Sequence, residues 1–192
     1  MTRNSYIFFK AFKASLPILI GYGAMGFAAG VLVAVQNPDS ASVLWSFLGA
    51  VSISGTLQFL ICDWYRDQAS LAYVAAMTLA VSFRYALYGF SLITRWSGVP
   101  LWKKLILIWG LADENYALET LCRLRNKADY IRYSITLTLL DVSYWIGGCV
   151  LGAFAGEMLP IPNKGIEFVM VALFISILTD QIRDLLKGGA AK

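Results

Sequence analysis

Long uncharged stretches alternate with short charged segments along this chain. Between Lys13 and Asp39 the sequence holds 25 uncharged residues, which form about 37 Å of helix at about 1.5 Å per residue and can cross a bilayer. Five further apolar stretches follow. We therefore expect a single transmembrane domain over 1–192, with spans at 14–36, 40–62, 68–94, 105–122, 133–156 and 165–182 and a short tail at 183–192.

The composition is typical of an integral membrane protein. The 192 residues are 58% hydrophobic and 15% charged, with a mean hydropathy of +0.64, whereas about a quarter of the residues of a soluble domain are charged. The chain is therefore expected to be an all-α, polytopic helical bundle that is integral to a lipid bilayer.

Basic residues predict the orientation of the spans. With six full spans and a cytoplasmic amino terminus, eleven of the 16 Lys and Arg residues lie inside, four lie outside, and Arg84 lies within the membrane. A re-entrant hairpin at 40–62 would give seven inside and eight outside. Because cytoplasmic loops are enriched in Lys and Arg, six spans with both termini cytoplasmic are favoured, although Lys103 and Lys104 then fall outside. This topology also explains the net charge of +4 without a nucleic-acid partner.

Several chemistries are excluded by missing residues. There is no histidine, so the chain cannot supply histidine ligands or a Ser-His or Cys-His pair. Cys62, Cys122 and Cys149 lack the spacing of a metal site or disulfide framework, and no phosphate-binding loop is present. We expect no metal, no cofactor and no enzymatic activity.

Several charged residues lie inside expected spans, and Arg84, Asp113, Glu114 and Asp141 are the deepest of them. Arg84 and Asp113 are each roughly 14 to 15 Å deep on adjacent antiparallel helices, so an ion pair between them is expected to offset the cost of burying each charge. Asp113 and Glu114 point about 100° apart on a helix, so the second acid faces a cavity or is protonated. This makes Asp113, Glu114 and Asp141 candidates for proton coupling. The alternative is a static ion pair that holds the helices in register.

A polar patch interrupts the second expected span. It includes Ser54, Gly55, Thr56 and Gln58. Such a patch can unwind a helix and expose backbone groups to a zwitterionic ligand, or it can form hydrogen bonds between helices.

Glycines recur at four-residue spacing in two of the expected spans. Gly26 and Gly30 lie in the first span, and Gly148, Gly152 and Gly156 lie in the fifth. These stripes predict either close helix packing or a substrate groove.

Five sequence blocks resemble the azaleucine-resistance, or AzlC-like, branched-chain amino acid permease family. The Arg-x-x-x-Tyr-Gly and Asp-Glu blocks are the specific ones, and Ser82 and Tyr85 stand where relatives usually have Asn and His. The blocks are 17–22 with Gly26 and Gly30, Ser54–Phe59, Phe83–Gly89, Leu101–Lys104 leading to Asp113–Leu118, and Gly165–Phe168 with Ala172–Phe174.

The resemblance implies the large subunit of a two-component amino-acid exporter in the bacterial cytoplasmic membrane, working with a small AzlD-like membrane subunit. Arg84 would then bind the substrate carboxylate, Asp113 or Glu114 its ammonium group, and Tyr22, Tyr88 and Tyr116 would line an apolar slot. The full expected substrate-binding set is Gly21, Tyr22, Gly26, Ser54, Gly55, Gln58, Arg84, Tyr88, Asp113 and Glu114.

Three other functions compete with transport by an exporter subunit. The chain could be a non-transporting scaffold or assembly subunit, as its glycine stripes suggest. It could be an intramembrane aspartyl protease that uses Asp113 and Asp141, or a passive channel, although its polar residues cluster at one depth.

Overall fold

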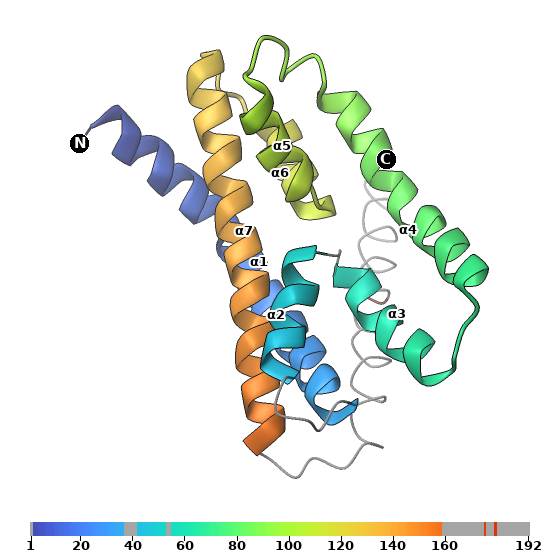
Figure 1. Cartoon of the computed structure of the whole chain (residues 1–192). Helices are drawn as coiled ribbons and strands as arrows, with labels where there is room; N and C mark the ends of the chain where they lie inside the picture. The colour runs from blue at the N-terminus through green and yellow to red at the C-terminus, as the bar shows by residue number, and fades with distance from the viewer. Residues whose placement is uncertain (1, 37–41, 53–54, 159–174, 176–178, 180–192) are drawn as a thin grey trace.

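The computed structural model describes residues 2–36, 42–52, 55–158, 175 and 179. Within these residues it contains seven α-helices and no strand (Figure 1). This agrees with the predicted all-α membrane bundle. The helices are α1 (Arg3–Gln36), α2 (Ser42–Ser52), α3 (Gly55–Arg66), α4 (Leu71–Leu92), α5 (Leu101–Trp109), α6 (Asp113–Leu121) and α7 (Lys127–Met158).

The long helices α1 and α7 run in the same direction, pack against each other and form the centre of the fold (Figure 1). Their closest approach is at the glycine stripes. A Cβ atom on Gly26 would lie 2.9 Å from the carbonyl oxygen of Trp145, and one on Gly30 would overlap the backbone of Cys149. Only glycine allows this approach, so the helix-packing interpretation of the stripes is confirmed.

Polar contacts fix the register of α1 on α7 near the amino terminus. The guanidinium of Arg3 forms an ion pair with Asp129 at 2.6 Å, and Arg132 donates a hydrogen bond to the side chain of Asn4 at 2.7 Å. A buried apolar cluster lies below these contacts, formed by Ile7, Ala11, Tyr133 and Leu137.

The stretch expected as a second span, 40–62, is divided into two short helices. At about 1.5 Å per residue, α2 is about 16 Å long and α3 about 18 Å, roughly half the apolar thickness of a bilayer each. Helices α2 and α3 run in opposite directions, and this reversal of direction makes them a helical hairpin rather than one crossing helix (Figure 1). The polar, glycine-containing patch lies at this reversal.

The stretch expected as a fourth span, 105–122, is also a hairpin. Helix α5 ends at Trp109, and the backbone N–H of Gly110 caps it by donating to the carbonyl of Ile106 at 3.2 Å. The buried side chain of Asn115 donates to the carbonyl of Gly110 at 2.7 Å. These bonds satisfy backbone groups that a broken helix would otherwise leave without partners.

Within the described residues, three helices are long and apolar enough to cross a membrane, namely α1, α4 and α7. Large apolar side chains of α4 are mostly exposed, for example Leu79 at 71% and Phe90 at 73%. Such a surface is favourable against lipid and unfavourable against water. The expected sixth span at 165–182 lies outside the described residues, apart from Ile175 and Thr179.

The predicted side of the loop after α4 is wrong. The prediction separated the loop after α4 from the loop between α6 and α7, but Lys127 Nζ lies 3.3 Å from Ser97 Oγ, and Arg95 donates to the carbonyl of Glu119 at 2.7 Å. Because the α5–α6 hairpin turns back, both loops lie at the end of the bundle that contains Arg3 (Figure 1).

Candidate functional site

The turns of the two hairpins meet in the middle of the fold. At the end of α5, Trp109 Nε1 donates a hydrogen bond to the carbonyl oxygen of Val51, near the end of α2, at 2.9 Å. The helices that leave these turns, α3 and α6, both begin here, at Gly55 and Asp113. A helix amino terminus carries a partial positive charge, so two such ends at this depth favour anionic groups, as in transporters built from broken helices.

Arg84 of α4 forms the predicted ion pair with Asp113 of α6. Its Nη1 lies 2.8 Å from the Asp113 Oδ2 atom. The two side chains are 40% and 42% exposed, so the pair is open on one side. A ligand can therefore approach both charges.

Arg84 makes further contacts with the α2–α3 hairpin and with its own helix. Its Nη2 donates to Thr56 Oγ1 at 3.3 Å and to the Tyr85 hydroxyl at 3.1 Å, and its guanidinium lies 5.0 Å from the centre of the Tyr85 ring. Among the described residues, Arg84 Nε and Asp113 Oδ1 have no hydrogen-bond partner. One donor and one acceptor therefore remain unused at the pair.

A group of tyrosines lies beside this pair. The rings of Tyr88 and Tyr116 stack with their centres 4.4 Å apart and an interplanar angle of 13°. Tyr85 meets Tyr88 edge to face at 6.2 Å, and the Tyr116 hydroxyl lies 3.0 Å from Ser91 Oγ. The predicted proximity of Tyr88 and Tyr116 is present, whereas Tyr22 lies elsewhere.

Glu114 faces away from Arg84, as the predicted angle between the neighbouring acids requires. Its Oε2 accepts a hydrogen bond from the Tyr22 hydroxyl of α1 at 2.6 Å. The Tyr22 ring in turn packs edge to face on Trp145 of α7, with centres 5.8 Å apart. The two neighbouring acids at the start of α6 therefore contact different helices, Asp113 contacting α4 and Glu114 contacting α1.

Asp141 is the most deeply buried of the expected acids. Its side chain is 1% exposed, and neither carboxyl oxygen has a hydrogen-bond partner among the described residues. Glu114 and Tyr22 belong to its electrostatic surroundings. A buried, unpartnered carboxyl group is costly when ionised, which favours its protonated form.

Other members of the predicted set do not join the ion pair. Gln58 is buried and accepts a hydrogen bond from Trp145 Nε1 at 3.2 Å, and a Cβ atom on Gly55 would lie 2.9 Å from the Trp145 ring. Gly26 lies in the α1–α7 contact, and Gly21 has nothing within 4 Å of a Cβ atom. Ser54 lies outside the described residues.

Sequence reasoning missed three residues of the junction, Tyr85, Trp109 and Asn115. A signal for the break was present, because Gly110 is a typical helix end and Asp113 and Glu114 are typical of a first helical turn. Reading this pattern as a carboxyl cap followed by an amino-terminal turn predicts two helices instead of one.

Comparison with known proteins places the chain among membrane proteins. The chain is 32% identical to an "Uncharacterized membrane protein" of Helicobacter pylori (strain J99) over 180 residues, which covers 92% of this chain and 78% of the relative. It is 27% identical to the "Branched-chain amino acid transport protein AzlC" of Bacillus subtilis, over 94% of this chain and 71% of that protein. It is 31% identical to "Inner membrane protein YgaZ" of Escherichia coli, over 91% and 73%.

No solved structure matches the chain. The AzlC protein family matches residues 17–159, a stretch that includes the Arg84–Asp113 pair, both hairpins and the glycine stripes. The chain therefore belongs to the AzlC protein family.

Proposed function

We propose that this chain is the large subunit of an exporter of branched-chain or related aliphatic amino acids. The observation that carries the proposal is the half-exposed Arg84–Asp113 pair at the junction of two helical hairpins. The name of the B. subtilis relative supports amino-acid transport. The outward direction rests on the resemblance to exporters, because a site in the middle of the membrane serves either direction.

The pair suits a zwitterion. The guanidinium of Arg84 can bind the substrate carboxylate through two parallel N–H donors, and the carboxylate of Asp113 can accept from the substrate ammonium group. Arg84 Nε and Asp113 Oδ1 are buried and have no partner among the described residues, so they become available as a donor and an acceptor when the internal pair opens. Substrate binding then replaces the ion pair between Arg84 and Asp113 by two ion pairs with the ligand, so both side chains keep an oppositely charged partner.

The tyrosines beside the pair supply the contact for an aliphatic side chain. Tyr88 and Tyr116 present a stacked pair of rings next to Asp113. A branched aliphatic group gains free energy by leaving water for such a surface, about 0.8 kcal/mol for each buried methylene. Tyr22 belongs to the Glu114 side of the junction and is not part of this slot.

Proton coupling is the second part of the proposal, through Glu114 and Asp141. Asp141 is buried without a hydrogen-bond partner among the described residues, and its neighbour Glu114 is hydrogen-bonded to Tyr22. Asp141 is the proposed carrier of the proton, because a buried carboxyl group without a partner is costly to ionise, and Glu114 is the acid beside it. Asp113 is occupied by Arg84 and is the weaker candidate for this role.

The distribution of basic residues supports an orientation with the Arg3 end in the cytoplasm. Ten of the twelve Lys and Arg residues in the described part of the chain belong to segments at that end, namely the first part of α1, the loop after α4, the start of α5, the α6–α7 connection and the start of α7 (Figure 1). The other two are Arg84, at the junction, and Arg66, the last residue of α3. The ten are Arg3, Lys10, Lys13, Arg95, Lys103, Lys104, Arg123, Arg125, Lys127 and Arg132. We place the protein in the cytoplasmic membrane, in line with the name of the E. coli relative.

The proposal includes a small AzlD-like membrane subunit as a partner. Its basis is the family resemblance. The requirement for this subunit is tested by expressing the chain with and without it.

The experiment is efflux of preloaded labelled valine, leucine, isoleucine and methionine from cells that express the chain with the small subunit. Arg84→Ala and Asp113→Asn are compared with Lys104→Gln, which removes a charge from the start of α5 and outside the ion pair. We expect efflux that depends on the small subunit, is lost in the first two variants at equal membrane abundance, and slows when the proton gradient is collapsed.

Each part of the proposal has its own negative result. Efflux that is unchanged after collapse of the gradient contradicts proton coupling. Absence of efflux for all four amino acids, with stable membrane insertion of both subunits, contradicts transport and favours the scaffold function.

A further inference from the structure

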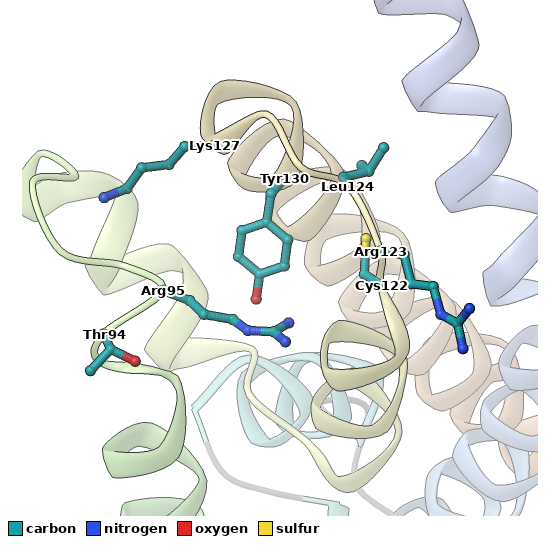
Figure 2. A pocket seen from close by; sticks show the side chains of 7 residues that line it. All are labelled: Thr94, Arg95, Cys122, Arg123, Leu124, Lys127 and Tyr130. Atoms are coloured by element: carbon teal, nitrogen blue, oxygen red, sulfur yellow. The ribbon is translucent and has the colours of Figure 1, made fainter.

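A cavity of about 400 Å³ lies at the Arg3 end of the molecule, away from the Arg84–Asp113 pair. It opens between the loop that follows α4 and the connection from α6 to α7 (Figure 2). Its lining comes from three segments, Thr94 and Arg95, Cys122–Leu124, and Lys127 with Tyr130.

The cavity has three basic side chains with hydrogen-bonding capacity to spare. Arg95 donates to the carbonyl of Glu119 at 2.7 Å and lies against the Tyr130 ring, and its guanidinium has five N–H groups, so donors remain for a ligand. Lys127 lies 3.3 Å from Ser97 Oγ, a single contact for three donors. Arg123 makes no hydrogen bond or ion pair with the other described residues and is exposed.

Acidic groups nearby do not cancel this charge. Glu119 is 1% exposed and lies behind Tyr130, whose hydroxyl donates to it at 2.7 Å. Asp129 is already paired with Arg3. The cavity therefore keeps a surplus of positive charge, with the guanidinium of Arg95 held 5.5 Å from the centre of the Tyr130 ring.

The surroundings of the cavity are those of a membrane interface. Trp102 is 59% exposed and Leu101 is 72% exposed on α5, and Ile93 is 57% exposed at the end of α4. Exposed tryptophan next to basic residues is typical of the headgroup level. A ligand in the cavity can thus place a charged group among the basic side chains and an apolar tail along α4 and α5.

We propose that this cavity binds a phosphate ester, specifically the headgroup of an anionic phospholipid in the cytoplasmic leaflet. Guanidinium groups bind phosphate oxygens in pairs, and a lysine adds a point charge. Basic cavities between helices on the cytoplasmic side are suited to anionic headgroups. The bound lipid would join the α4–α5 loop to the start of α7 and stabilise this end of the bundle.

The test uses the full chain, purified in a neutral detergent. Its unfolding temperature and the lipid retained in native mass spectrometry are measured with phosphatidylglycerol, phosphatidylcholine or inorganic phosphate. The Arg123→Gln/Lys127→Gln variant is compared with Lys104→Gln/Arg125→Gln, which removes the same charge from the same end but outside the cavity.

We expect phosphatidylglycerol to be retained and to raise the unfolding temperature, whereas phosphatidylcholine does neither. The cavity variant should bind it about 30-fold more weakly, about fivefold for each basic side chain removed, and the control variant should bind as the unchanged protein does. Equal loss in both variants, or loss in neither, overturns the cavity as the site. Equal stabilisation by inorganic phosphate overturns the lipid as its source.

Discussion

The indole nitrogen of Trp109 lies 2.9 Å from the carbonyl oxygen of Val51, so the turns of the two hairpins are joined by a hydrogen bond. Each hairpin spans only about half of an apolar bilayer and enters from the opposite side. The bond satisfies a backbone acceptor near the end of α2, at a depth where lipid offers no hydrogen-bond donor. It also sets the distance between Thr56, at the start of α3, and Asp113, at the start of α6.

Replacing this donor should loosen the junction. Trp109→Phe leaves the Val51 carbonyl without its partner, and we expect a loss of about 1 kcal/mol in unfolding free energy and slower transport. Trp102→Phe is the control, because Trp102 is exposed on the same helix, where Lys103 Nζ lies 5.2 Å from the centre of its ring. Equal effects of both changes on thermal unfolding would contradict the role given to Trp109.

Two glycines of α7 should respond oppositely to alanine. A Cβ atom on Gly152 would overlap the backbone of Phe27, whereas one on Gly147 has nothing within 4 Å. We expect Gly152→Ala to cost about 2 kcal/mol through overpacking and Gly147→Ala to gain up to about 1 kcal/mol through helix propensity. Thermal unfolding in detergent measures both, and a neutral Gly152→Ala would contradict the close contact of α1 and α7.

The hairpins predict which loops a membrane-impermeant thiol reagent reaches. In a chain lacking its three native cysteines, Asp67→Cys should be labelled in intact cells, whereas Lys103→Cys and Arg125→Cys should require permeabilisation. Six full spans predict the reverse for the first two positions and the same result for the third. Labelling of Lys103→Cys in intact cells would contradict the hairpin at α5 and α6.

The long apolar helices and the buried ion pair could be predicted from the sequence, because they depend on composition and on single charged residues. Uncharged length located α1, α4 and α7, and the cost of a buried charge predicted the partners Arg84 and Asp113. The different directions of Asp113 and Glu114 followed from helix geometry alone. Each of these features depends on local properties of one or two segments.

The hairpins were not predicted, because total hydrophobicity does not distinguish one long apolar helix from two short ones. The break after Trp109 depends on the cap formed by Gly110 and Asn115, and Trp109 contacts a residue 58 positions away in sequence. The count of basic residues compared six full spans with a single hairpin at 40–62, and it favoured the six spans. That topology places the loop after α4 on the wrong side. With both hairpins, the exception at Lys103 and Lys104 disappears, because they lie at the Arg3 end.

Removing the buried acid should separate coupling from folding. Asp141→Asn eliminates a carboxyl group that has no hydrogen-bond partner among the described residues, so we expect equal or higher thermal stability together with efflux that no longer responds to the proton gradient. Asp129→Asn is the control, because it breaks an ion pair with the exposed Arg3 at the surface. It should change the unfolding free energy by no more than about 1 kcal/mol and leave the response to the gradient intact.

A variant Asp141→Asn that unfolds would indicate a structural carboxylate. A stable variant that keeps its full response to the gradient would assign coupling to other groups.

The central claim is that Arg84 and Asp113 recognise the two charges of one amino acid. It is tested most directly by measuring binding of labelled leucine to the purified protein, with competition by leucinamide, which lacks the carboxylate, and by 4-methylpentanoate, which lacks the ammonium group. Leucine should compete and neither analogue should compete well. Arg84→Gln and Asp113→Asn should each abolish binding, whereas Lys104→Gln should not. Unchanged leucine affinity in a folded Arg84→Gln protein would contradict the account.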